Sequence, residues 1–220
     1  MAALFVSSSA FAAQPYHIEL EADPALAFPY LRIFGTVEIH VYPSGVRTEA
    51  LWLNAFSKNG TPAVTVANPL TRTYSEVPVS EIAAILAKLA GAGGIERETA
   101  PPSVEKPMAG KVGGVSAMRY RLRFGPQAWV DVWTTHAIPE NPQLRAIIDQ
   151  LIAGISPPTA AAARTIKGTP LYVELNFRRF KKVPLVRLKK LTHTSDDEKD
   201  ALELGPLYMR TGGLEKVFEK

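Results

Sequence analysis

The segment from residue 110 to residue 135 constrains the fold most, because period-two alternation lies on both sides of a turn signal. Apolar residues alternate with arginines before the turn, and Trp129, Asp131 and Trp133 alternate with small apolar residues after it. Before the turn every second side chain is apolar and the ones between are arginines, the period-two pattern of a half-buried β-strand. The apolar set is Met118, Tyr120, Leu122 and Phe124, and the arginines are Arg119, Arg121 and Arg123. Residues 125–127 (Gly-Pro-Gln) supply the turn. The pattern predicts an antiparallel β-hairpin.

The length of the hairpin loop decides which side chains share a face of this ribbon. A two-residue loop and a four-residue loop give the same parity, and either one places Trp129 and Trp133 with the apolar set of the first strand. The three arginines then share the opposite face with Ala128, Val130 and Val132. We therefore expect one aromatic face and one basic face.

The rest of the chain repeats the strand pattern and interrupts it with two helical segments. Alternation predicts strands within residues 16–21, 31–42, 46–53, 61–79, 171–177 and 184–191. Apolar residues at helical spacing follow Ser80 and follow Asn141, each of which we interpret as a helix N-cap. Residues 157–163 are interpreted as a connection. Because no strand–helix–strand rhythm is present, the sequence predicts an antiparallel α+β fold with eight to ten strands and two amphipathic helices.

The N-terminus predicts export. Residues 3–11 form an apolar run that is too short to span a bilayer, and residues 10–12 (Ala-Phe-Ala) fit a signal-peptidase site before Gln14. A buried N-terminal strand is the alternative. We expect a signal peptide at residues 1–13 and a single domain at residues 14–220, in a soluble, monomeric periplasmic protein.

Residue types and spacings argue against catalysis, metals and cofactors. Cysteine is absent, which excludes disulfides, thiolate chemistry and cysteine zinc sites. The four histidines show no metal-ligand spacing, and no phosphate-binding or nucleophile-elbow motif occurs. Asp131, between Trp129 and Trp133, could act as a general acid if buried, but the favoured interpretation is that it pairs with a nearby arginine or lies at the rim of the sheet. We therefore expect no catalytic residue, no metal ligand and no cofactor.

A basic run near the C-terminal end predicts contact with an anionic membrane surface. Between residues 164 and 190 nine lysines and arginines are opposed only by Glu174. Each basic residue near such a surface contributes about 1 kcal/mol. The expected contact residues are Arg178, Arg179, Phe180, Lys181 and Lys182. A solvated hairpin is the alternative, and nucleic acid is not expected as a partner of an exported chain.

Four short motifs between residues 111 and 171 carry a family resemblance. Residues 111–114 (KVGG), 117–120 (AMRY), 133–135 (WTT) and 167–171 (KGTPL) resemble, in this order, a bacterial envelope family of unknown function. Members of that family are similar in fold to the periplasmic lipoprotein carriers LolA and LolB. The resemblance spans residues 16–191 and is best over residues 110–177. It implies a curved antiparallel half-barrel with helices over its concave face.

This fold suggests a cavity between sheet and helices that could hold an apolar ligand. The residues predicted to line it are Trp52, Met118, Tyr120, Leu122, Phe124, Trp129, Trp133, Ile148 and Leu151. Trp52 belongs to this set only if residues 44–45 form a two-residue loop. The expected function is a periplasmic binding or carrier protein for a lipid or a lipoprotein acyl chain. The alternatives are an envelope scaffold or sensor that binds another protein, and an enzyme that combines Asp131 with a histidine.

Overall fold

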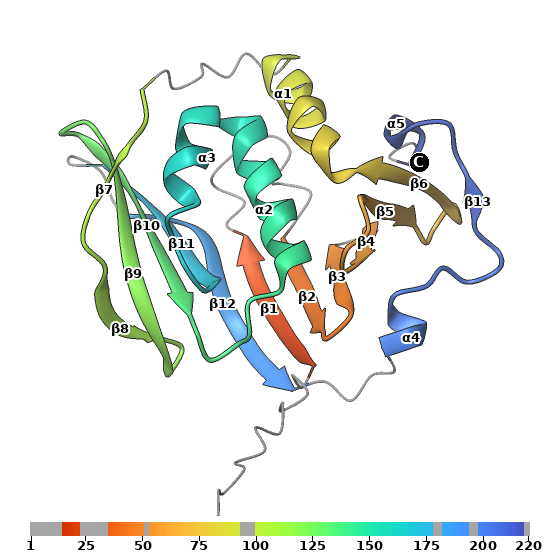
Figure 1. Ribbon diagram of the computed structural model, residues 1–220, viewed down its shortest axis with the longest axis horizontal. Helices are drawn as coiled ribbons and strands as arrows, with labels where there is room; N and C mark the ends of the chain where they lie inside the picture. Colours follow the sequence, from red (N-terminus) through yellow and green to blue (C-terminus); the bar gives the residue numbers. More distant parts are fainter. Residues whose placement is uncertain are drawn as a thin grey trace, which may run out of the picture.

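The strands build one large, open sheet, as the computed structural model in Figure 1 shows. The structure describes residues 15–22, 35–50, 53–92, 100–177, 182–193 and 198–217. Within these ranges the strand order is β13-β6-β5-β4-β3-β2-β1-β12-β11-β10-β9-β7, and β8 also pairs with β9. All of these pairs are antiparallel except the short pair of β13 with β6. The predicted antiparallel α+β class is thus confirmed, but the described ranges hold 13 strands and five α-helices, more than the expected eight to ten strands and two helices.

The strands have the following bounds: β1 (Tyr16–Ala22), β2 (Thr36–Tyr42), β3 (Gly45–Ala50), β4 (Leu53–Lys58), β5 (Ala63–Asn68), β6 (Thr73–Pro78), β7 (Ser103–Val104), β8 (Met108–Val112), β9 (Val115–Phe124), β10 (Ala128–Thr135), β11 (Thr169–Phe177), β12 (Val183–His193) and β13 (Met209–Arg210). The helices are α1 (Ile82–Ala92), α2 (Pro142–Ile155), α3 (Pro157–Ala163), α4 (Glu198–Ala201) and α5 (Leu214–Val217), and a 3-10 turn, η2, covers Val79–Glu81. No helix within the described ranges is long and apolar enough to cross a membrane.

Helices α2 and α3 cover one face of the sheet, which we call the inner face. Leu144 of α2 packs into a buried cluster with Ile18, Leu20 and Leu171 from β1 and β11. Further along the sheet, Ile166 after α3 packs on a second cluster from β9. Each fully buried aliphatic side chain contributes about 1.5–3 kcal/mol relative to an exposed one. These clusters fix both helices to the sheet.

The start of α2 is fixed by Asn141, as the sequence predicts. The Asn141 Oδ1 atom accepts hydrogen bonds from the backbone N–H groups of Gln143 (2.9 Å) and Leu144 (3.0 Å). Its Nδ2 donates to the carbonyls of Tyr42 and Gly45, both at 3.3 Å. One buried side chain therefore caps the helix and ties it to the turn between β2 and β3.

Two expectations about the helices are wrong. Ser80 is not an N-cap, because it lies inside the 3-10 turn η2, which begins after Pro78 and has no side-chain capping hydrogen bond. Residues 157–163 are not a connection but form α3, with proline at its first position. Proline is compatible with the first turn of a helix, since the N–H that it lacks would have no partner there.

The predicted faces of the central hairpin are also wrong. Ala128 pairs with Phe124, so the loop holds the three residues 125–127, and Gly125 in it has a φ of +68°. A three-residue loop reverses the parity of the second strand. Trp129 therefore lies opposite Arg123 and Trp133 opposite Arg119, so both tryptophans share a face with the arginines. The opposite, inner face carries the Met118-to-Phe124 apolar set with Val130 and Val132.

The face with the arginines and tryptophans, opposite α2 and α3, is called the outer face below. Over β2 and β4 this face is covered by the C-terminal segment, because Leu202 after α4 packs on Tyr42 and Phe56. Over β9–β12 it carries the charged residues described next.

Candidate binding face

Strand register arranges the outer face of β9–β12 in three rows of side chains. The first row is Arg119, Trp133, Tyr172 and Arg187; the second is Arg121, Asp131 and Glu174; the third is Arg123, Trp129 and Asn176. Side chains directly opposite one another on neighbouring strands have Cβ atoms about 5 Å apart, so each row is a line of contacts. The rows combine cations, aromatic rings and carboxylates on one surface.

The arginines lie over the two tryptophans. The Arg119 Cζ atom is 5.8 Å from the Trp133 ring centroid, while Arg121 and Arg123 lie 5.1 Å and 5.6 Å from the Trp129 ring. A guanidinium at this distance is attracted by the electron-rich ring face, by about 0.5–1 kcal/mol at an exposed site. The tryptophans therefore hold the arginines against the sheet.

The centre of the face is a buried ion pair. Asp131 is only 4% exposed, and its two carboxylate oxygens accept hydrogen bonds from Nε (2.7 Å) and Nη2 (2.8 Å) of Arg121. The bond to Asp131 raises the pKa of the Arg121 guanidinium. Of the two favoured interpretations of Asp131, the structure shows the arginine partner and not a position at the sheet rim. A carboxylate bound in this two-pronged manner has both oxygens occupied as acceptors.

A second carboxylate lies next to the first. Glu174 pairs with Asp131 in register, is 8% exposed, and accepts a 2.7 Å hydrogen bond from the Tyr172 hydroxyl. Burial, with a further contribution from this hydrogen bond, raises the pKa of Tyr172 to about 12. Tyr172 is therefore a neutral hydrogen-bond donor at physiological pH. Lys182 lies 3.9 Å from the other oxygen of Glu174.

At the edges of the outer face, basic side chains outnumber the carboxylates near them. Arg123 pairs with Glu105, and Lys189 with Glu19 at 3.4 Å. Among the described residues, no carboxylate lies within ion-pair distance of Arg119, Arg187 or Lys190. Arg187 and Lys190 are exposed. The outer face over β9–β12 therefore presents a surplus of positive charge.

The structure does not bring the predicted cavity residues together. Met118, Tyr120, Leu122 and Phe124 lie in the cluster under α3, Ile148 packs on the cluster around Leu144, Leu151 is 40% exposed on α2, and Trp129 and Trp133 lie on the outer face. Trp52 is outside the described residues, as are residues 1–13 and Arg178, Arg179, Phe180 and Lys181 of the predicted membrane tip. Lys182 from that tip is described, and its side chain is 76% exposed.

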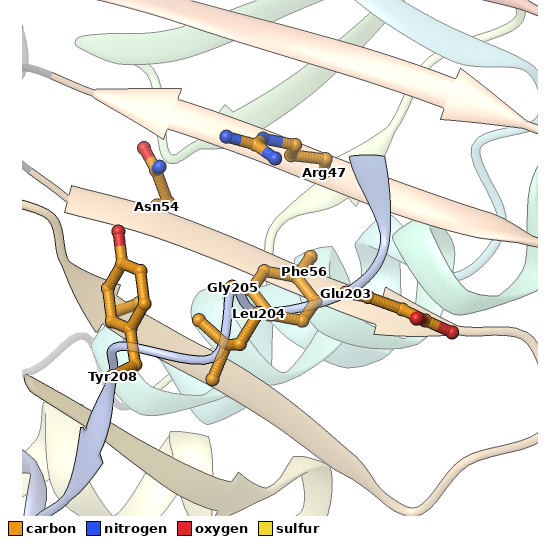
Figure 2. Close-up of a pocket in the computed structure, with 8 residues that line it drawn as sticks. Arg47, Asn54, Phe56, Glu203, Leu204, Gly205 and Tyr208 are labelled. Carbon is orange, nitrogen blue, oxygen red and sulfur yellow. The ribbon is translucent and has the colours of Figure 1, made fainter. Parts of the chain in front are cut away.

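Two pockets lie away from the predicted cavity. The first, of about 180 Å³, is formed between β3–β5 and the C-terminal segment, and Figure 2 shows Leu204 and Tyr208 of that segment with Arg47 and Phe56 from the strands. The second, of about 80 Å³, lies beside the start of α2. Pockets for drug-sized ligands hold about 300–1,000 Å³. Neither pocket is lined by a predicted cavity residue.

Two of the motifs behind the family resemblance, residues 133–135 and residues 167–171, meet at one structural junction. The Thr134 hydroxyl donates to the Lys167 carbonyl at 2.5 Å, and the Thr135 hydroxyl donates to the Ser116 carbonyl at 2.8 Å. Gly168 has a φ of +87°, and a Cβ there would lie 2.7 Å from the Thr135 carbonyl oxygen. These residues therefore close the connection from β10 to β11 through backbone contacts, which is a structural role.

Sequence reasoning missed part of this face. The alternation of residues 171–177 places Tyr172, Glu174 and Asn176 on one side of β11, but only the pairing of β10 with β11 shows that Asp131 lies beside Glu174. It also missed a cluster on the same outer face, where His17 of β1 lies opposite His40 of β2. The Glu38-x-His40 spacing in a strand was the available signal, because it places both side chains on one face.

Comparisons with known proteins assign no family to this chain. No family model matches the chain, and no curated protein matches it. A crystal structure of an uncharacterised conserved protein from Thermus thermophilus aligns with 90% of this chain and 90% of its own, with a TM-score of 0.48 and 10% sequence identity.

Proposed function

We propose that the chain is a non-catalytic binding protein of the bacterial envelope, which docks on anionic lipid headgroups through the outer face of β9–β12. The observation that carries this proposal is the row Arg119–Trp133–Tyr172–Arg187. It has a cation at each end, two aromatic side chains between them, and no described carboxylate in ion-pair contact with either arginine.

Charge and aromaticity suit the headgroup region of a membrane. Each lysine or arginine held near an anionic bilayer surface gains about 1 kcal/mol. Tryptophan and tyrosine combine an apolar ring with a polar group, which favours them at the boundary between lipid and water. Lys182, just before β12, and Lys190 within it extend the same basic surface.

The two buried carboxylates support binding over catalysis. Asp131 is held by Arg121, and Glu174 is held by Tyr172, so both are occupied by neighbours on the same face. The leader expected at residues 1–13 would bring the chain to the envelope, where anionic lipid is accessible. The resemblance to the family with the LolA- and LolB-like half-barrel fold points to the same compartment.

Co-sedimentation with vesicles tests this function. The full chain without a purification tag is mixed with phosphatidylcholine vesicles that contain or lack phosphatidylglycerol. We expect sedimentation only with the anionic vesicles, and weakening at high salt because salt screens exposed charges. Arg119→Glu combined with Arg187→Glu removes two favourable charges, so the lipid concentration at half-binding rises by at least about tenfold.

The matched control is Lys88→Glu combined with Lys167→Glu. Both lysines are exposed, Lys88 lies on α1 and Lys167 follows α3, and the change in net charge is the same. The control is expected to bind like the wild type. Equal binding by the outer-face variant, or equal loss in the control, would show that this face does not dock on the membrane.

A second candidate is the carrier of a lipid or lipoprotein acyl chain. Phe124, Ala128 and Phe177 form an apolar row on the inner face at one end of the sheet, and Phe177 is 37% exposed there. Native mass spectrometry after bacterial expression tests it, since a carrier retains lipid mass. The mass of the bare chain would favour the surface-binding function, or a scaffold that binds a folded protein.

A further inference from the structure

Two histidines and a glutamate converge on the outer face of β1 and β2, outside the basic rows. His17 and His40 are directly opposite each other in register, and Glu38 precedes His40 by two residues, so all three side chains project from the same face. The imidazole rings are stacked with centroids 4.5 Å apart and planes inclined by 17°.

The donor atoms of this trio are spaced closely enough to share one ion. His17 Nε2 lies 3.2 Å from Glu38 Oε2, and His40 Nε2 lies 3.8 Å from the same oxygen. One donor atom from each residue can be chosen so that all three lie within 4.8 Å of one another. Two ligands bound at about 2.0–2.1 Å to a tetrahedral ion are roughly 3.3 Å apart. The two nitrogen–oxygen distances therefore bracket the required one.

A second observation concerns the environment of His17. Its Nε2 atom is buried and, although it lies close to Glu38, makes no hydrogen bond within the described part of the chain. Buried polar atoms nearly always have a polar partner, and the partner of this nitrogen in the metal-free chain is the Glu38 carboxylate at 3.2 Å. A metal ion beside the Glu38 carboxylate would be such a partner for the nitrogen lone pair.

We propose that His17, Glu38 and His40 bind one divalent transition-metal ion. Imidazole and carboxylate together favour ions such as zinc, nickel and copper over magnesium and calcium, which prefer oxygen ligands alone. The Glu38 side chain is 44% exposed, so the remaining coordination positions face solvent. The site is therefore an open one, in which water or another small ligand completes the metal shell.

The charges around the trio are balanced, so Glu38 itself supplies the negative charge of the site. Glu19 and Glu49 flank Glu38 on the neighbouring strands, and each has a basic partner of its own, Lys189 for Glu19 and Arg47 for Glu49. Arg47 is the cation opposite His40, but it pairs with Glu49 at 2.7 Å and donates to the Ala201 carbonyl at 3.0 Å. Because nearly parallel rings cannot both direct their in-plane lone pairs at one ion, metal binding rotates one imidazole and opens the stack.

Calorimetric titration of the tag-free full chain with zinc chloride tests the site, after treatment with a chelator. We expect one zinc ion per chain. His17→Gln, Glu38→Gln and His40→Gln are each expected to raise the dissociation constant by more than about tenfold, since even the loss of an outer-shell partner costs 10–100-fold. His136→Gln removes an exposed histidine elsewhere and is expected to bind zinc like the wild type.

A measurement on the wild type alone avoids any variant that fails to fold. In NMR spectra of the histidine side chains, zinc is expected to shift the ring signals of His17 and His40 and to leave those of His136 and His193 in place. The absence of zinc binding, binding that survives loss of both His17 and His40, or shifts confined to His136 or His193 would each overturn the proposed site. The proposal does not depend on lipid binding, and neither outcome of the vesicle assay decides it.

Discussion

The Arg121 guanidinium bridges both oxygens of Asp131 across the β9–β10 pair, with donor–acceptor distances of 2.7 Å and 2.8 Å. The contact exists because residues 125–127 form a three-residue loop, which brings arginines and the acid to one face. The pair holds Arg121 beside the Trp129 ring, 5.1 Å from its centroid. The ion pair thus organises the outer face from its centre.

Asp131→Asn is expected to lower the free energy of unfolding by about 2 kcal/mol. Removing the carboxylate leaves the charge of the Arg121 guanidinium without compensation. The expected loss of stability is below the roughly 3–5 kcal/mol of a fully buried pair, because the Arg121 side chain is 20% exposed. Urea unfolding measures the change. Glu76→Gln breaks the exposed pair with Arg210 and is expected to cost less than about 1 kcal/mol. Equal losses in the two variants would contradict the central role of Asp131.

The raised pKa of Tyr172 predicts a loss of stability at alkaline pH. The folded chain keeps the Tyr172 proton up to about pH 12, whereas the unfolded chain releases it near the ordinary value of 10. Between these values the native state binds more protons, so the free energy of unfolding falls as pH rises. The difference between the wild type and Tyr172→Phe is expected to shrink from pH 10 to pH 12. A difference that is constant over this range would show that Tyr172 is not perturbed.

Asn141→Ala is expected to cost about 2 kcal/mol or more, because the side chain both caps α2 and donates two hydrogen bonds to the β2–β3 turn. Asn141→Asp keeps the capping oxygen and loses the donor. Thermal unfolding of the two variants separates the contributions. We expect Asn141→Asp to be more stable than Asn141→Ala at neutral pH, because it keeps the capping oxygen. The reverse order would show that the hydrogen bonds to the β2–β3 turn contribute more to stability than the cap does.

Gly168→Ala is expected to destabilise the chain more than Gly60→Ala. Both glycines have positive φ, at +87° and +78°, so each substitution carries the cost of a left-handed backbone, about 1 kcal/mol. Only at Gly168 would the new Cβ lie 2.7 Å from a backbone oxygen, while at Gly60 nothing lies within 4 Å. Chemical unfolding of both variants gives the difference. Equal losses of stability in the two variants would show that the close approach of Gly168 to Thr135 adds no cost to the substitution.

The sequence predicted the strands of the central hairpin but not its faces. Alternation around a turn is visible in residues 118–133, whereas the parity of the second strand depends on whether the loop holds an even or an odd number of residues. Gly125-Pro126-Gln127 is compatible with both. The loop length alone decides that Trp129 and Trp133 lie on the face with the arginines and not on the apolar face.

The same limit explains what was found and missed elsewhere. Asn141 followed by Pro142 is a local signal, and the cap is confirmed because capping depends on neighbours in the chain. Glu174 beside Asp131 and His17 beside His40 depend on pairing between strands that are distant in sequence or joined by a long connection. No spacing rule within one segment reports such a contact.

A label on each side of the sheet tests the docking face most directly. The chain contains no cysteine, so Met108→Cys and Leu151→Cys each give a single attachment point for a nitroxide. Met108 is 57% exposed at the edge of the outer face, where its sulfur accepts a hydrogen bond from Arg119, and Leu151 is 40% exposed on α2. On phosphatidylglycerol vesicles, the label at residue 108 is expected to lose contact with a water-soluble paramagnetic relaxant, while the label at residue 151 keeps it. Protection at residue 151 alone, or at neither position, would contradict membrane docking through the outer face.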